Sequence, residues 1–262
     1  MMLQLGVQGV AVLGPGFSDW AQAAPLLREP AQWQRTPTAV PAPALLPATE
    51  RRRAGTVVKA SVAVADAACT AAGLAPAALG TVFTSSTGDP ANCHAICEAL
   101  AKPERAVSPT RFTNSVHNVA AGYWHIATQS MQASTSLGAF DASFAAGLLE
   151  AAAQCVHGQR PLLLVACDTP YPEPLHGVRA LPDSFALALV LVPHGGRGLR
   201  IGIGGDAAPT PCSDAALEAL RGEIPAARAL PLLQALAAPA AAALVIEGLP
   251  GQSLALQLDA AA

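Results

Sequence analysis

The sequence predicts a layered α/β fold, and three observations support this. Segments with the composition of strands alternate along the chain with segments of helical periodicity, which is the pattern of layered α/β proteins. Two continuous apolar runs, 161–166 (PLLLVA) and 184–192 (SFALALVLV), are typical of strands buried on both faces. Finally, 262 residues are enough for one sizeable core, in one domain or at most two.

Apolar runs bounded by turns predict the strands. In chain order we expect strands at 8–13, 81–84, 132–137, 161–166, 184–192 and 199–203, followed by a hairpin of 243–247 and 253–258. Small and apolar residues at helical spacing predict helices at 55–72, 92–101, 116–128, 138–156, 213–220 and 230–237. Gly122, among small residues of the third helix, is expected to let neighbouring elements approach closely. The segments 24–49 and 102–114 show no sustained period, so we expect them to be irregular.

Charge and composition exclude several classes of partner. The chain has 15 Lys and Arg against 18 Asp and Glu, which is far from the basic surface that nucleic acid requires. Only 13% of its residues are charged and 52% are apolar, so we expect a large apolar interface with another protein. The first 16 residues lack the pattern of a signal peptide, and 226–245 is too rich in alanine and proline for a membrane span. We therefore expect a cytoplasmic protein, and we interpret Arg51, Arg52 and Arg53 as a solvated face.

No metal or cofactor is expected. Cys93, His94 and Cys97 are the one metal-like cluster in the sequence, but no second pair of ligands follows at zinc-finger spacing. The run 201–205 (IGIGG) lacks the third spaced glycine and the following helix of a dinucleotide-binding fingerprint.

The most informative stretch lies between residues 107 and 168. It contains HNVAAGYW at 117–124 and DASFAAGLLEA at 141–151, followed by a strand-like run that ends at Asp168. These motifs resemble the β-ketoacyl synthases, and most of all the short ketosynthase-like proteins of aryl polyene pathways. The resemblance implies a thiolase-like fold with a ketosynthase-like N-terminal domain, 1–192. A divergent tail, 193–262, is then expected to pack on the same domain.

The resemblance also implies where a catalytic residue would stand. In these synthases a strand ending in Ser-Thr-Ala-Cys-Ala runs into a buried helix, whose amino terminus favours a thiolate. Laid on this run, residues 134–138 (STSLG) put Leu137 at the cysteine position, and leucine cannot be acylated. We therefore expect no catalytic residue, with Ser136 as the fallback nucleophile, although strand alternation would aim Ser136 away from Leu137. We interpret His117 as structural and His194 as exposed.

Such a protein is expected to be a chain length factor, a non-catalytic subunit that pairs with an active β-ketoacyl synthase. An acyl carrier protein is a further possible partner. Because ketosynthases pair through the strand before the nucleophile, the resemblance implies an interface at Gln132, Ser134 and Ser136, and a tunnel end lined by Phe112, Leu137 and Phe140. The alternative is an acyltransferase of the same fold, in which Ser136 accepts the acyl group.

Overall fold

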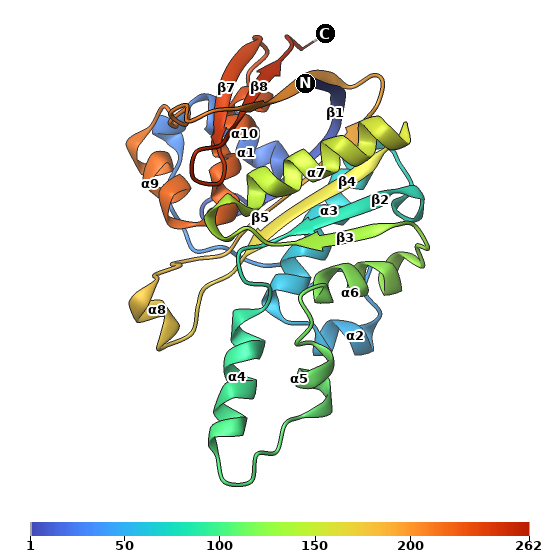
Figure 1. The fold of residues 1–262 in the computed structure, drawn as a ribbon, viewed down its shortest axis with the longest axis vertical. Coiled ribbons are helices and arrows are strands. Elements are labelled where there is room, and N and C mark those ends of the chain that lie inside the picture. The colour runs from blue at the N-terminus through green and yellow to red at the C-terminus, as the bar shows by residue number, and fades with distance from the viewer. Residues whose placement is uncertain (1, 262) are drawn as a thin grey trace.

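A computed structural model describes residues 2–261, and in this part of the chain eight strands form one sheet (Figure 1). The strand order is β3-β2-β4-β5-β1-β6-β8-β7. The strands are β1 (Met2–Leu13), β2 (Gly80–Thr84), β3 (Ser134–Leu137), β4 (Leu162–Asp168), β5 (Phe185–Val192), β6 (Arg197–Gly204), β7 (Ala242–Glu247) and β8 (Ser253–Leu258). The longer helices are α1 (Trp20–Arg28), α3 (Thr56–Ala72), α4 (Pro90–Ala101), α6 (Val119–Thr128), α7 (Ser143–Gly158), α9 (Ala215–Glu223) and α10 (Leu230–Ala237), and the short ones are α2 (Ala48–Arg53), α5 (Pro109–Thr113) and α8 (Leu175–Val178).

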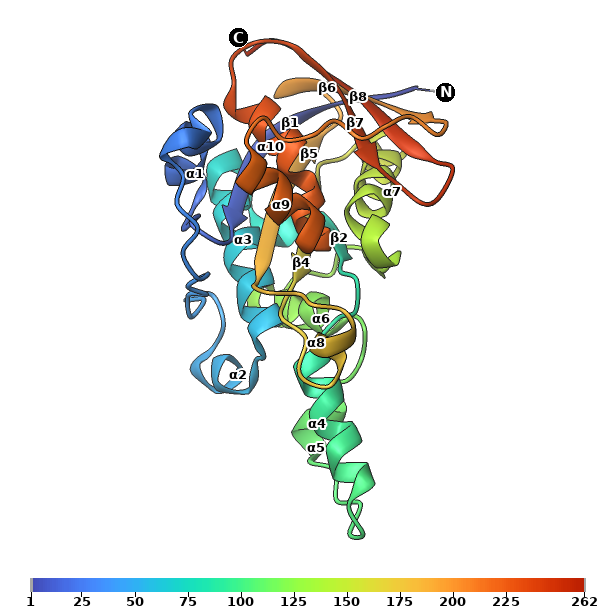
Figure 2. The same ribbon diagram turned by 90° about the vertical axis from the view of Figure 1, so that its left-hand side faces the viewer.

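Helices cover both faces of the sheet. Helices α3 and α6 pack on one face, and α7, α10 and α1 contribute to the core on the other. Figure 2 shows α3 and α7 on opposite sides of the sheet. Every residue of β2, β4 and β5 is buried, because these strands lie between the two helical layers. Strands β3, β2 and β4 are parallel, so their carboxyl ends lie at the same edge of the sheet. The layered α/β prediction is therefore confirmed.

The C-terminal residues continue the same sheet. Strand β6 pairs with β1, β8 pairs with β6, and β7 forms the far edge. The predicted hairpin and the helix at 230–237 are both present. The functional division of the chain at residue 192 remains a prediction. None of the helices in the described part of the chain has the length and hydrophobicity that a membrane crossing requires.

Two segments that we expected to be irregular contain helices. The first segment, 24–49, contains the second half of α1, which begins at Trp20 because the Asp19 carboxylate accepts a hydrogen bond from the Gln22 amide. Helix α1 then buries Ala23 and Leu27 although it contains a proline. In the second, Pro109 starts α5, since proline suits the first turn of a helix. The Asp19 cap and the apolar side chains at helical spacing thus form α1, and the proline start forms α5.

The helix expected at 138–156 begins later than predicted. Helix α7 starts at Ser143 and follows a single 3-10 turn, η3 (Phe140–Ala142). The expectation that Gly122 allows close packing is wrong, because a Cβ atom there would meet nothing within 4 Å. Close packing occurs instead at Gly147 in α7, where a Cβ atom would lie 2.6 Å from the Thr84 methyl group of β2.

These two helical glycines give a matched test of packing. We expect Gly147→Ala to lower the free energy of unfolding by about 1–3 kcal/mol, because the added methyl overlaps a β-branched side chain. We expect Gly122→Ala to raise it by about 0.5–1 kcal/mol, because alanine favours a helix and the site is open. Urea unfolding followed by circular dichroism measures both. Equal effects of the two substitutions would contradict the packing of α7 on β2.

Candidate functional site

Strand β3 is an edge strand, and its alternate side chains enter different surroundings. Leu137 packs against the core that α7 covers, whereas Ser136 lines a small pocket on the other face of the sheet. Ser134 lies on the same side as Ser136, where its hydroxyl bonds to the Thr81 hydroxyl at 2.8 Å. Gln132 lies two residues before the strand and is half-buried. The strand therefore separates Ser136 from Leu137.

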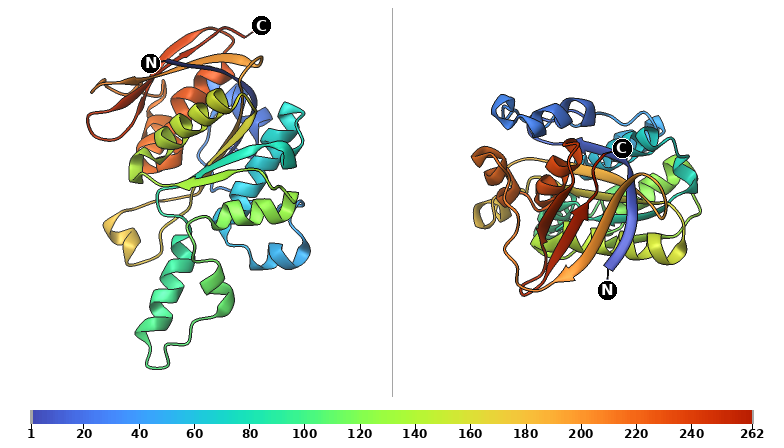
Figure 3. Two further views of the ribbon diagram at one scale, coloured as in Figure 1. Left: turned by 45° about the vertical axis from the view of Figure 1, so that its right-hand side comes forward. Right: turned by 90° about the horizontal axis from the view of Figure 1, so that it is seen from above.

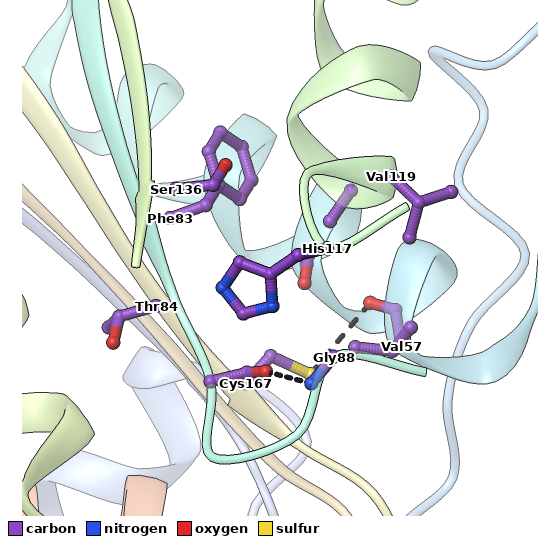
Figure 4. Close-up of a pocket in the computed structure, with 11 residues that line it drawn as sticks. Val57, Phe83, Thr84, Gly88, His117, Val119, Ser136 and Cys167 are labelled. Carbon is purple, nitrogen blue, oxygen red and sulfur yellow. Dashed lines mark hydrogen bonds between the residues drawn. The ribbon is translucent and has the colours of Figure 1, made fainter. Parts of the chain in front are cut away.

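The pocket beside Ser136 also contains an imidazole and a thiol (Figure 4). Its volume of about 20 Å³ is roughly that of one water molecule. Cys167, at the end of β4, lines the pocket, and its Sγ lies 3.8 Å from the Val57 carbonyl oxygen. Burial raises the pKa of the Cys167 thiol to about 12, so the thiol is protonated at neutral pH. It is therefore not an activated nucleophile.

His117 lies against the backbone of two loops. A Cβ atom on Gly88 would lie 3.5 Å from His117 Nδ1, and one on Gly138 would lie 3.4 Å from His117 Cε1. These are ordinary contact distances, so the ring packs beside both glycines. His125 is elsewhere, with Nδ1 2.8 Å from the Ser130 carbonyl oxygen, and His194 is exposed beside Gln159. Of these three histidines, only His117 lines the pocket with Ser136.

The turn from β3 into α7 carries no nucleophile. Residues 137–142 are LGAFDA, which includes neither a thiol nor a hydroxyl. The first hydroxyl of α7 belongs to Ser143, which is buried, donates to the Phe140 carbonyl oxygen at 2.7 Å and accepts from the Ala139 amide at 2.9 Å. Phe140 stands where the helical turns begin, with a φ of 53° that is strained for a bulky side chain.

Arginines hold this turn in place. The guanidinium of Arg179 lies 3.7 Å from the centre of the Phe140 ring and pairs with the Asp141 carboxylate. Arg228 is largely buried and forms two ion pairs. Its Nη2 lies 3.1 Å from Asp141 Oδ2, and its Nη1 lies 2.7 Å from Glu247 Oε1 of β7. The ion pairs thus join the turn to the α8 loop and to the C-terminal strands.

A buried carboxylate supports the same region. Asp168, at the end of β4, accepts hydrogen bonds from the Ser86 amide at 2.7 Å, the Ser86 hydroxyl at 2.8 Å and the Ala226 amide at 2.9 Å. Burial raises the pKa of this carboxyl, although the hydrogen bonds oppose the shift. Asp168 therefore connects the loop after β2 to the 3-10 helix η4 (Pro225–Ala229).

The structure brings together some of the residues proposed from the sequence. Ser134, Ser136 and Leu137 share β3, and Phe140 follows within one turn and is 59% exposed. Phe112 is apart from them on α5, 72% exposed, and does not line the pocket. Sequence reasoning missed Arg179 and Arg228, whose partners are distant in the chain. Asp168 carried a signal, since it is a charged residue that ends an apolar run.

Comparison with known proteins adds a family match. The family described as beta-ketoacyl synthase, N-terminal domain, matches residues 20–256. No curated protein matches the sequence.

Several solved structures have a similar fold. A ketosynthase (ApeO) in complex with its chain length factor (ApeC) from Xenorhabdus doucetiae includes a chain with 22% identity and a TM-score of 0.75, over 97% of this chain and 99% of that one. The ishigamide ketosynthase/chain length factor has 15% identity and a TM-score of 0.69, over 99% of this chain and 100% of that one. A β-ketoacyl synthase from Burkholderia phymatum STM815 has 14% identity and a TM-score of 0.60, over 86% of this chain and 71% of that one. At these identities the likeness establishes the fold.

The cysteines give a test of this site's chemistry. At neutral pH we expect iodoacetamide to alkylate the exposed Cys93 and Cys97 and to spare Cys167, because only a thiolate reacts and the Cys167 pKa is about 12. Peptide mass spectrometry locates the label, and urea-unfolded protein, in which all six cysteines should react, is the control. Rapid alkylation of Cys167 in the folded protein would show that the pocket activates this thiol.

Proposed function

This chain belongs to the family of β-ketoacyl synthase N-terminal domains, and we propose that it is a chain-length-factor-like subunit that pairs with an active β-ketoacyl synthase. The thiolase-like fold expected from the sequence is confirmed. One observation carries the proposal: the turn at 137–142, where a synthase needs its nucleophile, has no residue that can form a thioester. The chain thus retains the scaffold without the acylated residue.

The similar structures support a paired assembly. Two of them are described as a ketosynthase with a chain length factor, and in both the matched chain is about as long as this one. A third is described as a ketosynthase with an acyl-carrier protein. By analogy we propose a ketosynthase partner in fatty acid or polyketide-type biosynthesis, such as an aryl polyene pathway. We also propose contact with an acyl carrier protein and a cytoplasmic location.

The free edge of β3 is suited to strand pairing. The Ala133 carbonyl oxygen accepts a hydrogen bond from the Thr81 amide of β2, and the Leu137 carbonyl oxygen accepts one from the Ser85 amide just after β2. By alternation the N–H and C=O groups of Ser134 and Ser136 therefore point away from the sheet. Met131, just before the strand, is 96% exposed, and Ile126 on α6 is 54% exposed. Pairing with a partner would satisfy the edge and cover these apolar side chains.

Phe140 is the side chain that the site presents outward. Its strained backbone and its stacking on Arg179 hold the ring at the amino end of α7. Together with the half-buried Leu137, Phe140 would limit the space available to an acyl chain at the interface. Phe112 of α5 would line the end of the tunnel in the partner subunit.

Proline at the edge tests the pairing. We expect Ser134→Pro to leave the fold intact, because the Ser134 amide faces outward, and to weaken the heterodimer at least tenfold by removing a hydrogen-bond donor and adding a ring at the interface. Ser134→Val, which keeps the amide, is the matched control. Co-expression with a pathway ketosynthase followed by size-exclusion chromatography measures assembly. A stable monomer that ignores the ketosynthase, or a Ser134→Pro heterodimer of normal affinity, would contradict the proposal.

The alternative is acyl transfer through Ser136, and the position of His117 in the same pocket favours it as second candidate. A serine with a nearby imidazole is the arrangement of a general-base-activated nucleophile. The subunit proposal predicts no covalent adduct when the chain is incubated with acylated carrier protein and measured by intact mass. An acyl adduct that is lost in both Ser136→Ala and His117→Ala would establish the alternative.

A further inference from the structure

Two cysteines lie on the surface of the arm formed by α4 and α5 (residues 90–113), which projects from the body of the molecule in Figures 1 and 3. Cys93 and Cys97 both belong to α4 and are exposed, whereas the other four cysteines of the chain are buried. Cysteine is among the residue types most often found in the core, where it acts as a small apolar side chain. Core packing therefore does not account for this exposed pair.

The two thiols share one face of a regular helix. Helix α4 is 12 residues long, and the Asp89 carboxylate caps it by accepting a hydrogen bond from the Asn92 amide at 3.0 Å. Residues four apart in a helix lie one above the other on the same face, so Cys97 follows Cys93 by one turn. Partial burial and the neighbouring Cys97 thiol both raise the pKa of the Cys93 thiol, which places the two sulfur atoms within reach of each other.

The spacing of the pair admits a bridging ion but not a disulfide. Cβ atoms four residues apart in a helix are separated by about 5–6 Å, whereas a disulfide requires about 3.5–4.5 Å. A metal–thiolate bond is about 2.3 Å long, so an ion between two sulfur atoms can hold them up to about 4.6 Å apart. We propose that Cys93 and Cys97 bind a soft monovalent metal ion, copper(I), between their sulfur atoms.

The number of ligands selects the ion. In residues 2–261 no group of three or more histidine, cysteine or carboxylate side chains is arranged to hold a metal. The imidazole next to the pair is engaged, since His94 Nε2 lies 3.4 Å from Glu98 Oε1. Zinc takes four ligands, whereas copper(I) favours thiolates and is satisfied by two of them on opposite sides. The lack of a second ligand pair therefore argues against zinc but not against copper(I).

Binding of copper(I) at this site requires no electron transfer. Each thiol releases its proton to solvent as its sulfur binds the ion, so two protons leave and two metal–sulfur bonds form. Both side chains are exposed, and the ion can therefore enter directly from solvent. The second bond forms within the molecule once the first is made, so the two thiolates of one helical turn act as a chelate.

Transfer of copper(I) from its coloured complex with bicinchoninate, under nitrogen and with ascorbate, tests the proposal on the full chain. We expect the chain to withdraw one copper(I) ion, and Cys93→Ser and Cys97→Ser each to weaken binding about a hundredfold or more, because the chelate is lost. The double variant Cys97→Ser/Glu98→Cys is the matched control. It keeps two thiols on the exposed part of α4 but turns them to different faces, so it should bind as weakly as the single variants.

Alkylation gives a second measurement that requires no substitution. We expect bound copper(I) to protect Cys93 and Cys97 from iodoacetamide, which peptide mass spectrometry detects. Zinc(II), offered from its complex with 4-(2-pyridylazo)resorcinol, should stay with the indicator.

Several results would overturn the proposal. These are no uptake of copper(I), equal uptake by the control variant, or continued alkylation of both cysteines in the loaded protein. Withdrawal of zinc(II) as readily as copper(I) would show that other side chains complete a four-ligand site. Rapid formation of a Cys93–Cys97 disulfide with diamide would show that the helix does not hold the thiols apart. The proposal does not depend on a ketosynthase partner, so each can fail without the other.

Discussion

The buried carboxylate of Asp168 is the constraint on which the functional end of this molecule depends. A charge in the core is costly unless it is fully hydrogen-bonded, and Asp168 obtains its bonds from Ser86 and Ala226, two segments far apart in the chain. The loop after β2 and the 3-10 helix η4 must therefore meet at the end of β4. This meeting places Arg228 beside Asp141, and the ion pairs then hold the turn into α7. The geometry at Phe140 follows from a contact in the core.

The turn from β3 into α7 keeps an enforced shape although it carries no thiol or hydroxyl group. Residues 137–142 contain no nucleophile, yet the turn retains a strained backbone, a buried Ser143 that bonds both sides of it, and paired arginines. Strain of this kind persists only where the surroundings enforce it. In an enzyme such a shape positions a reacting atom. In this chain it positions an aromatic ring, which is consistent with a role in shaping an interface.

The sequence predicted the layered fold, the buried strands and the C-terminal hairpin because their periodicity is local. It also predicted that β3 would separate Ser136 from Leu137, since alternation depends only on the strand. It did not predict α1, which an Asp19 cap begins just before the segment expected to be irregular, or the short α5, which Pro109 begins. Nor could it predict the roles of Arg179 and Arg228, whose partners come close only through the tertiary fold. Close packing of a helical glycine also depends on the tertiary fold. Gly122 and Gly147 both follow two alanines in the sequence, but only Gly147 packs against a strand.

The open edge of β3 has a consequence for the cell that makes this protein. The backbone groups of Ser134 and Ser136 are unpaired beside Met131, and an open strand edge with apolar neighbours is a template for pairing with another extended chain. On the pairing proposed above, a surplus of this polypeptide over a ketosynthase partner would therefore be prone to aggregate or to be degraded. Balanced synthesis of the two subunits would then protect it. The proposed pairing would thus link the abundance of this protein to that of its partner.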